Sequence, residues 1–119
     1  MKNRIVSVSN LTGTNVYNRK GKKIGTIEDI AIDLVTGQVL YGVLSFGGFL
    51  GMGDKHFAVP PKALQFGSHH ENKITIDVDK DKLKDAPGFG KDKWPAQHNT
   101  KFIDSVYTHY GYEWKATPY

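Results

Sequence analysis

The chain has 119 residues, of which 39% are hydrophobic and 24% charged, values that fit one globular domain and exclude a disordered chain. It contains no cysteine, which excludes disulfides, thiolate nucleophiles, iron–sulfur clusters and cysteine zinc sites and fits a reducing cytoplasm. Its formal net charge of +4 is uneven, because the first 23 residues hold six basic residues and no acid.

The beginning of the chain does not resemble an export signal. After its basic residues only Ile5, Val6 and Val8 are apolar, whereas a secretory signal needs an apolar run of about 7–15 residues. No stretch approaches the roughly 18 apolar residues of a membrane-spanning helix. We therefore expect a cytoplasmic protein without a transmembrane segment.

The first two predicted strands flank a turn. A short strand is expected near Asn15–Tyr17, a turn with glycine at residues 18–23, and a second strand at residues 24–34. The apolar positions of the second strand change parity near Gly25 or Glu28–Asp29, which predicts a bulge or bend.

The end of this second strand shows a clear alternation. Ile30, Ile32 and Leu34 share one face, while Ala31 and Asp33 share the other. This pattern is typical of a half-buried strand, and it predicts that the isoleucines and the leucine face the core.

Three further strands are predicted in the middle of the chain. After a turn at Thr36–Gly37, residues 38–46 are apolar on both faces, which indicates a central strand that is covered on its outer side as well. Residues 57–59 form a strand that Pro60–Pro61 ends, and residues 73–78 alternate cleanly. Five or six short strands favour a small barrel or sandwich.

The last third of the chain predicts helices. Asp79 can cap a short helix through Leu83, and residues 88–98 read as an ordered loop. A second, amphipathic helix is expected over residues 100–110, ended by Gly111. We expect a barrel domain at 1–79 and a helical, aromatic extension at 80–119, packed on the barrel or on a second copy. The apolar stripe of the second helix consists of Phe102, Ile103, Val106, Tyr107 and Tyr110.

Seven segments carry a family pattern: Leu11–Asn18, Gly21–Asp29, Thr36–Tyr41, Ser45–Lys55, Phe57–Pro60, Ala86–Phe89 and Trp94–Pro95. Together they resemble the PRC-barrel family, in particular its bacterial stand-alone members, over roughly positions 9–96. The resemblance implies a mainly β fold, a small, strongly bent antiparallel barrel that acts as an interaction module without catalysis or cofactor. Similar barrels occur in the H subunit of the photosynthetic reaction centre and in a ribosome maturation factor; the membrane helix of the first and the N-terminal domain of the second are missing here.

No motif predicts a catalytic, metal or cofactor site. The glycine-rich residues 47–55 lack the Gly-Lys-Ser/Thr of a phosphate loop and place Asp54 where an anion would lie. His69 and His70 beside Glu71 would point to opposite sides if they lay on a strand, and they lie next to Gly67–Ser68 in a predicted surface turn. The acidic residues of 77–85 lack the glycine and glutamate of a calcium loop.

We therefore predict a homodimer or another protein partner for this chain. The apolar tip Phe49, Leu50 and Met52 either forms a contact patch or completes the core. An alternative is RNA or ribosome binding, and a second is an accessory role in photosynthesis or electron transport. The expected contact residues are Phe49, Leu50, Met52, Phe102, Val106 and Tyr110. RNA would bind to a basic patch, which could equally be a solvated turn and consists of Arg19, Lys20, Lys22 and Lys23.

Overall fold

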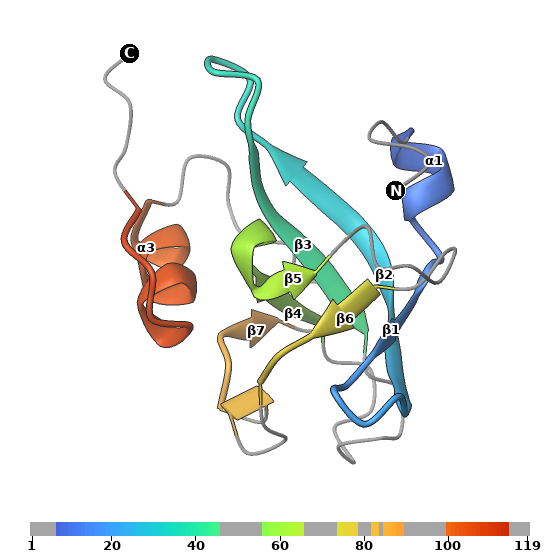
Figure 1. Cartoon of the computed structure of the whole chain (residues 1–119). Helices are drawn as coiled ribbons and strands as arrows, with labels where there is room; N and C mark the ends of the chain where they lie inside the picture. Colours follow the sequence, from blue (N-terminus) through green and yellow to red (C-terminus); the bar gives the residue numbers. More distant parts are fainter. Residues whose placement is uncertain are drawn as a thin grey trace.

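A computed structural model of the chain describes residues 7–45, 56–65, 74–78, 82–83, 85–89 and 100–114. Within these residues seven strands form one sheet in the order β5-β6-β1-β2-β3-β4-β7 (Figure 1). The elements are α1 (Val8–Leu11), β1 (Asn15–Tyr17), β2 (Lys23–Ile32), β3 (Val39–Ser45), β4 (His56–Val59), η1 (Pro61–Ala63), β5 (Leu64–Gln65), β6 (Ile74–Ile76), β7 (Gly88–Phe89) and α3 (Thr100–His109).

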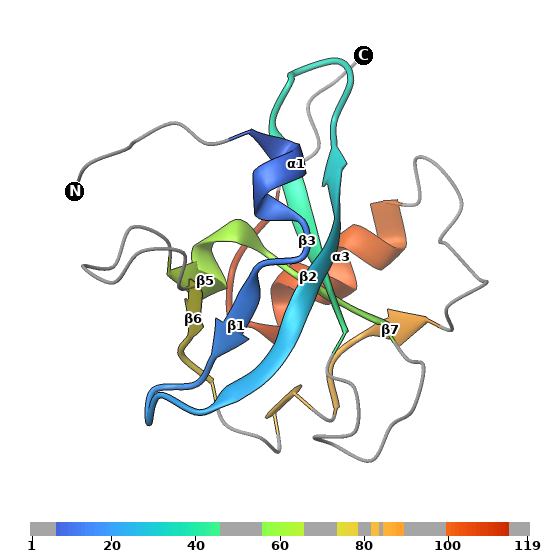
Figure 2. The same ribbon diagram turned by 90° about the vertical axis from the view of Figure 1, so that its right-hand side faces the viewer.

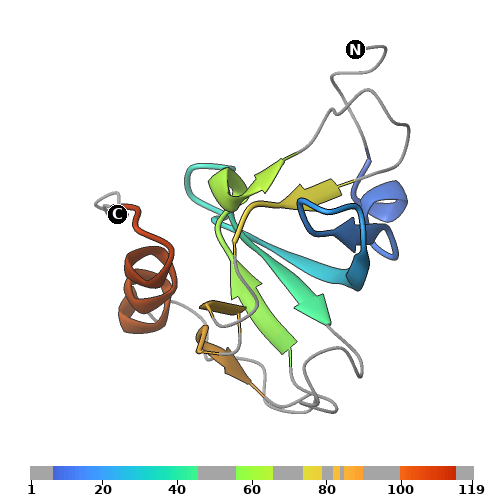
Figure 3. The ribbon, with the colours of Figure 1, turned by 60° about the horizontal axis from the view of Figure 1, so that its bottom comes forward.

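The long strand β2 bends where the sequence predicts a bend. Its register against β1 shifts between Val16 and Tyr17, and its register against β3 shifts between Ile27 and Asp29. Such irregularities bend a strand and increase its local twist. As a result the sheet curls into a half-barrel, and α1 and α3 lie on opposite sides of it (Figures 1 and 3).

One pairing differs from the wholly antiparallel barrel that we expected. Strand β6 runs parallel to β1, with Val16 opposite Ile74, whereas the other five pairings are antiparallel. A tight turn joins only antiparallel strands. Because β6 reaches β1 after four intervening strands in the chain, no turn dictates its direction.

The inside of the half-barrel is a continuous apolar core. Leu44 of β3 and Phe57 of β4 are fully buried there, and Leu11 of the unpredicted helix α1 packs against the same core. Burial of each such side chain contributes about 1.5–3 kcal/mol. The core consists of Val16, Ile24, Ile27, Leu44, Phe57, Val59, Ala63, Leu64, Ile74, Ile76, Leu83, Ala86 and Tyr110.

The outer face of β3 and β4 is covered by α3. Val43 of β3 and Ala58 of β4 pack against Ile103 and Val106 of the helix, and all four side chains are buried. Strand β3 is thus apolar and covered on both faces, which confirms the prediction of a central strand. The predicted helix is also confirmed; it ends at His109, two residues before Gly111, which has φ = 84°.

Strand β7 was not expected, because residues 88–98 read as a loop. Gly88 and Phe89 pair antiparallel with Phe57 and His56 of β4. The approach is close: a Cβ atom on Gly88 would lie 2.6 Å from the carbonyl oxygen of His56. The absence of a side chain at Gly88 therefore permits this pairing.

Candidate interaction surfaces

The hairpin between β2 and β3 ends in a turn built around Asp33. Its buried carboxylate Oδ1 accepts the backbone N–H groups of Val35 at 2.8 Å and Thr36 at 3.4 Å. The N–H of Gly37, at φ = 77°, donates to the Asp33 carbonyl at 2.7 Å. An aspartate that accepts from the backbone two residues further on is a standard way to order a turn.

This turn reverses the exposure expected from the alternation of residues 30–34. Asp33 is buried, whereas Leu34 is 93% exposed and Ile32 is 43% exposed. Two local events cause the difference. The register against β3 shifts at Ile32, where β2 ends, and the hydrogen bonds of the turn draw the Asp33 carboxylate inward.

The reversal creates an exposed apolar group, which we call the apolar hairpin tip. It contains four of the five exposed large hydrophobic residues in the described part of the chain, and the hairpin projects from the body of the sheet (Figures 1 and 2). Single exposed hydrophobics are ordinary, but neighbouring ones mark a contact site. The apolar pair Leu34–Val35 beside Thr36–Gly37 is the sequence signal for it. The tip consists of Ile32, Leu34, Val35 and Val39.

The contact residues proposed from the sequence fall into three groups. Phe49, Leu50 and Met52 lie outside the described residues. Val106 is fully buried and Tyr110 is 7% exposed, both against their own chain, so neither offers a surface to a partner in this structure. Phe102 is half-buried, and its ring meets the ring of Tyr41 edge-on with centroids 5.9 Å apart.

The basic residues Arg19, Lys20, Lys22 and Lys23 are exposed in and beside the turn between β1 and β2. Asn18 orders this turn, because its Oδ1 accepts the N–H of Lys20 at 2.9 Å and of Lys22 at 3.0 Å. The predicted hairpin turn is confirmed. Arg19 in addition forms an ion pair with Asp77, 2.5 Å from Nε to Oδ1. RNA binding by this turn stays a prediction.

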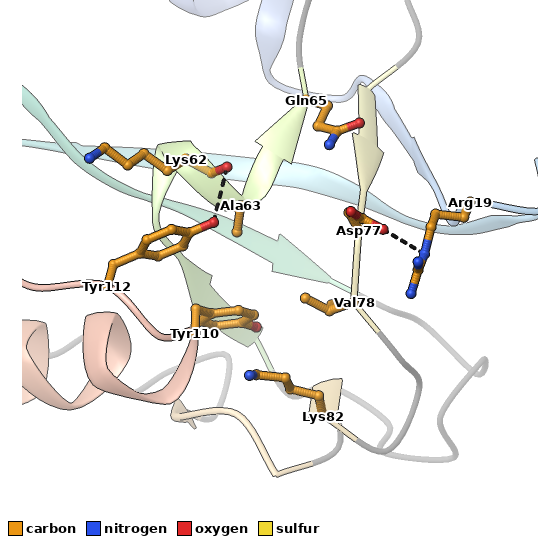
Figure 4. A pocket seen from close by; sticks show the side chains of 9 residues that line it. All are labelled: Arg19, Lys62, Ala63, Gln65, Asp77, Val78, Lys82, Tyr110 and Tyr112. Atoms are coloured by element: carbon orange, nitrogen blue, oxygen red, sulfur yellow. Dashed lines mark hydrogen bonds and ion pairs between the residues drawn. The ribbon is translucent and has the colours of Figure 1, made fainter.

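A pocket of about 290 Å³ lies between the ends of β6 and α3; we call it the tyrosine pocket (Figure 4). Five separate segments contribute to it, so no local sequence pattern could have predicted it. The Arg19–Asp77 ion pair lies at one side, and Tyr110 and Tyr112 lie at the other. Its lining residues are Arg19, Lys62, Ala63, Gln65, Asp77, Val78, Lys82, Tyr110 and Tyr112.

Hydrogen bonds to the backbone hold the tyrosine side of this pocket. The Tyr112 hydroxyl donates to the carbonyl of Lys62 at 3.4 Å, and Nε2 of His109 lies 2.7 Å from the carbonyl of Lys82. Both contacts connect the end of α3 to segments far away in the chain.

Tyr110 is the unusual member of the tyrosine pocket. Its hydroxyl is buried and has no hydrogen-bond partner among the described residues. Burial also raises the pKa of Tyr110 well above its ordinary value of 10.0, because the phenolate would lose its hydration. The group therefore remains a neutral O–H donor at physiological pH.

Among the described residues no three histidine or acidic side chains gather where they could hold a metal ion. In the same part of the chain no helix is both long and apolar enough to traverse a bilayer.

Comparison with known proteins relates most of the chain to a family of domains. The family model described as PRC-barrel domain matches residues 4–83, which is more than half of the chain. The match spans all strands from β1 to β6 and ends before β7 and α3. No protein of curated function matches the chain.

Proposed function

Because the chain belongs to the PRC-barrel domain family, we propose that it is a non-enzymatic interaction or assembly module whose contact surface is the apolar hairpin tip. PRC-barrel domains are general modules of protein interaction and assembly. The absence of cysteine supports a place in the cytoplasm.

The exposure of Leu34 is the observation that carries this proposal. This side chain is 93% exposed at the end of a projecting hairpin, next to Val35. Complete burial of a leucine or valine side chain contributes about 1.5–3 kcal/mol. The hydrogen bonds of Asp33 already order the turn, so binding loses little conformational entropy there.

The partner that we propose is a second copy of the chain. A twofold interface needs a surface that is complementary to itself. The apolar hairpin tip meets this condition, because Ile32, Leu34, Val35 and Val39 are all uncharged aliphatic residues that can pack against their own counterparts. A cluster of like charges such as the basic turn would instead repel its copy.

Size-exclusion chromatography with light scattering tests the dimer. The wild-type chain is expected to be dimeric, and Leu34→Asp is expected to be monomeric, because an aspartate would have to lose its hydration in an apolar interface. Val8→Asp is the matched control, since Val8 is also an exposed aliphatic residue but lies in α1. It should remain dimeric.

Two results would contradict the proposal. One is a wild-type chain that is monomeric at all accessible concentrations. The other is a Leu34→Asp variant that dimerises as well as Val8→Asp does. Far-ultraviolet circular dichroism of each variant shows whether the fold is intact, which excludes unfolding as the cause of a change in mass.

A further inference from the structure

The tyrosine pocket carries an inference that does not depend on the proposed dimer. Its charged side chains are Arg19, Lys62, Lys82 and Asp77. Asp77 is the one acid in this lining, and its carboxylate is already compensated by the ion pair with Arg19. Lys82 therefore gives the pocket a positive balance, which attracts anions.

The position of Lys82 relative to Tyr110 defines the polar end of the pocket. The contact between His109 and the carbonyl of Lys82 holds this segment beside the end of α3. In Figure 4 the side chain of Lys82 is directed beneath the ring of Tyr110, whereas that of Lys62 points away from the pocket. Lys82 is thus the lysine that can place its ammonium group next to a molecule bound against Tyr110.

The hydroxyl of Tyr110 provides a second, independent observation. A buried hydroxyl without a partner is unfavourable, and in native proteins such groups are rare. As a neutral phenol it can donate one hydrogen bond. The complementary group is an acceptor oxygen, and an oxygen with negative charge makes the stronger bond.

We propose that the tyrosine pocket binds the oxyanion group, a carboxylate or a phosphate, of a small organic molecule. The ammonium group of Lys82 and the hydroxyl of Tyr110 contact the oxyanion. The organic part packs against Val78, Ala63 and the ring of Tyr112, which form the less polar wall. A volume of about 290 Å³ is at the lower end of ligand pockets and suits a molecule with one ring.

Isothermal titration calorimetry tests this site: the full chain is titrated separately with phenyl phosphate, benzoate and benzyl alcohol. At least one of the two anions should bind with saturation, and the neutral alcohol should bind at least roughly tenfold more weakly, because it offers no charge-assisted hydrogen bond. Binding of phenyl phosphate alone identifies a phosphate site, and binding of benzoate alone a carboxylate site. Equal binding of the alcohol, or no saturable binding of either anion, would overturn the proposal.

Substitutions of the pocket residues test whether the anion binds in the tyrosine pocket. Lys82→Ala and Tyr110→Phe should each weaken binding of the anion by roughly tenfold, since each removes one hydrogen bond to a charged group. Lys20→Ala is the matched control, because Lys20 is an exposed lysine of the basic turn that does not line the pocket. It should bind as the wild type does; an equal loss in Lys20→Ala would show diffuse attraction by surface charge and would refute the site.

Tyr110→Phe also separates binding from folding. This change removes a hydroxyl that has no partner among the described residues, so the variant without ligand should be at least as stable as the wild type in thermal unfolding. A lower melting temperature would show that the hydroxyl serves the fold and not a ligand. The proposal requires weaker binding together with unchanged or higher stability.

Discussion

Gly88 shows how the absence of one methyl group permits a strand pairing. A Cβ atom there would lie 2.6 Å from the His56 carbonyl oxygen and 3.0 Å from the ring of Phe57. We expect Gly88→Ala to lower the free energy of unfolding by about 1–3 kcal/mol, because the backbone of β4 cannot move aside without disturbing the core. Urea denaturation measures the loss.

Gly42→Ala is the comparison, because the nearest neighbour of a Cβ atom at Gly42 would be the flexible end of the Leu64 side chain at 3.3 Å. If Gly42→Ala lowered the free energy of unfolding as much as Gly88→Ala or more, this explanation would be contradicted.

At the scale of the element, α3 is attached to the barrel by apolar packing and by a partly buried hydrogen bond. Val106 is fully buried, and the Tyr107 hydroxyl donates to the carbonyl of Leu40 at 2.6 Å. Val106→Ala should cost about 2 kcal/mol of unfolding free energy, and Tyr107→Phe about 1 kcal/mol. Chemical denaturation checks both, with the exposed Lys101→Ala as the control. If Val106→Ala were as stable as Lys101→Ala, α3 would not be part of the cooperative fold.

At the scale of the whole molecule, three half-buried or buried tyrosines make the free energy of unfolding depend on pH in the alkaline range. Burial raises the pKa of Tyr107 and Tyr110, and burial together with the charge of Asp29 raises the pKa of Tyr41. Above about pH 10 the unfolded chain loses these protons before the folded chain does. Stability should therefore be constant up to about pH 10 and then fall. The urea concentration at the unfolding midpoint, measured between about pH 8 and 12, follows this loss of stability. In the Tyr110→Phe variant the midpoint should fall less steeply with pH than in the wild type. An equally steep fall would contradict the role of Tyr110.

The elements that were predicted correctly depend on short-range patterns. Residues 39–45 are an apolar run between the turn at Thr36–Gly37 and Gly47, and residues 100–109 show a helical hydrophobic period that is followed by Gly111. Such signals act within a few residues, so they are visible without the tertiary structure. The two-residue strands β5 and β7 are too short to show a period, and only pairing with neighbours defines them.

The candidate surfaces were predicted less well than the fold. The alternation of residues 30–34 places Leu34 inside, because the pattern does not show that β2 ends at Ile32 and that the Asp33 turn follows. The basic turn was found, since its residues are adjacent in the chain. The tyrosine pocket was not found, because Lys82 and Tyr110 come together only when α3 docks.

The sequence by itself determined the β strands, the helix at the C-terminal end and the membership in the PRC-barrel family, because hydrophobic period, turn residues and family motifs are properties of neighbouring residues. Only the tertiary structure decided that β6 runs parallel to β1, that Val106 and Tyr110 are covered by their own chain, and that Leu34 is exposed. These outcomes depend on which distant segments share a surface. The arrangement that forms is the one in which the whole chain together buries its apolar area and satisfies its hydrogen bonds.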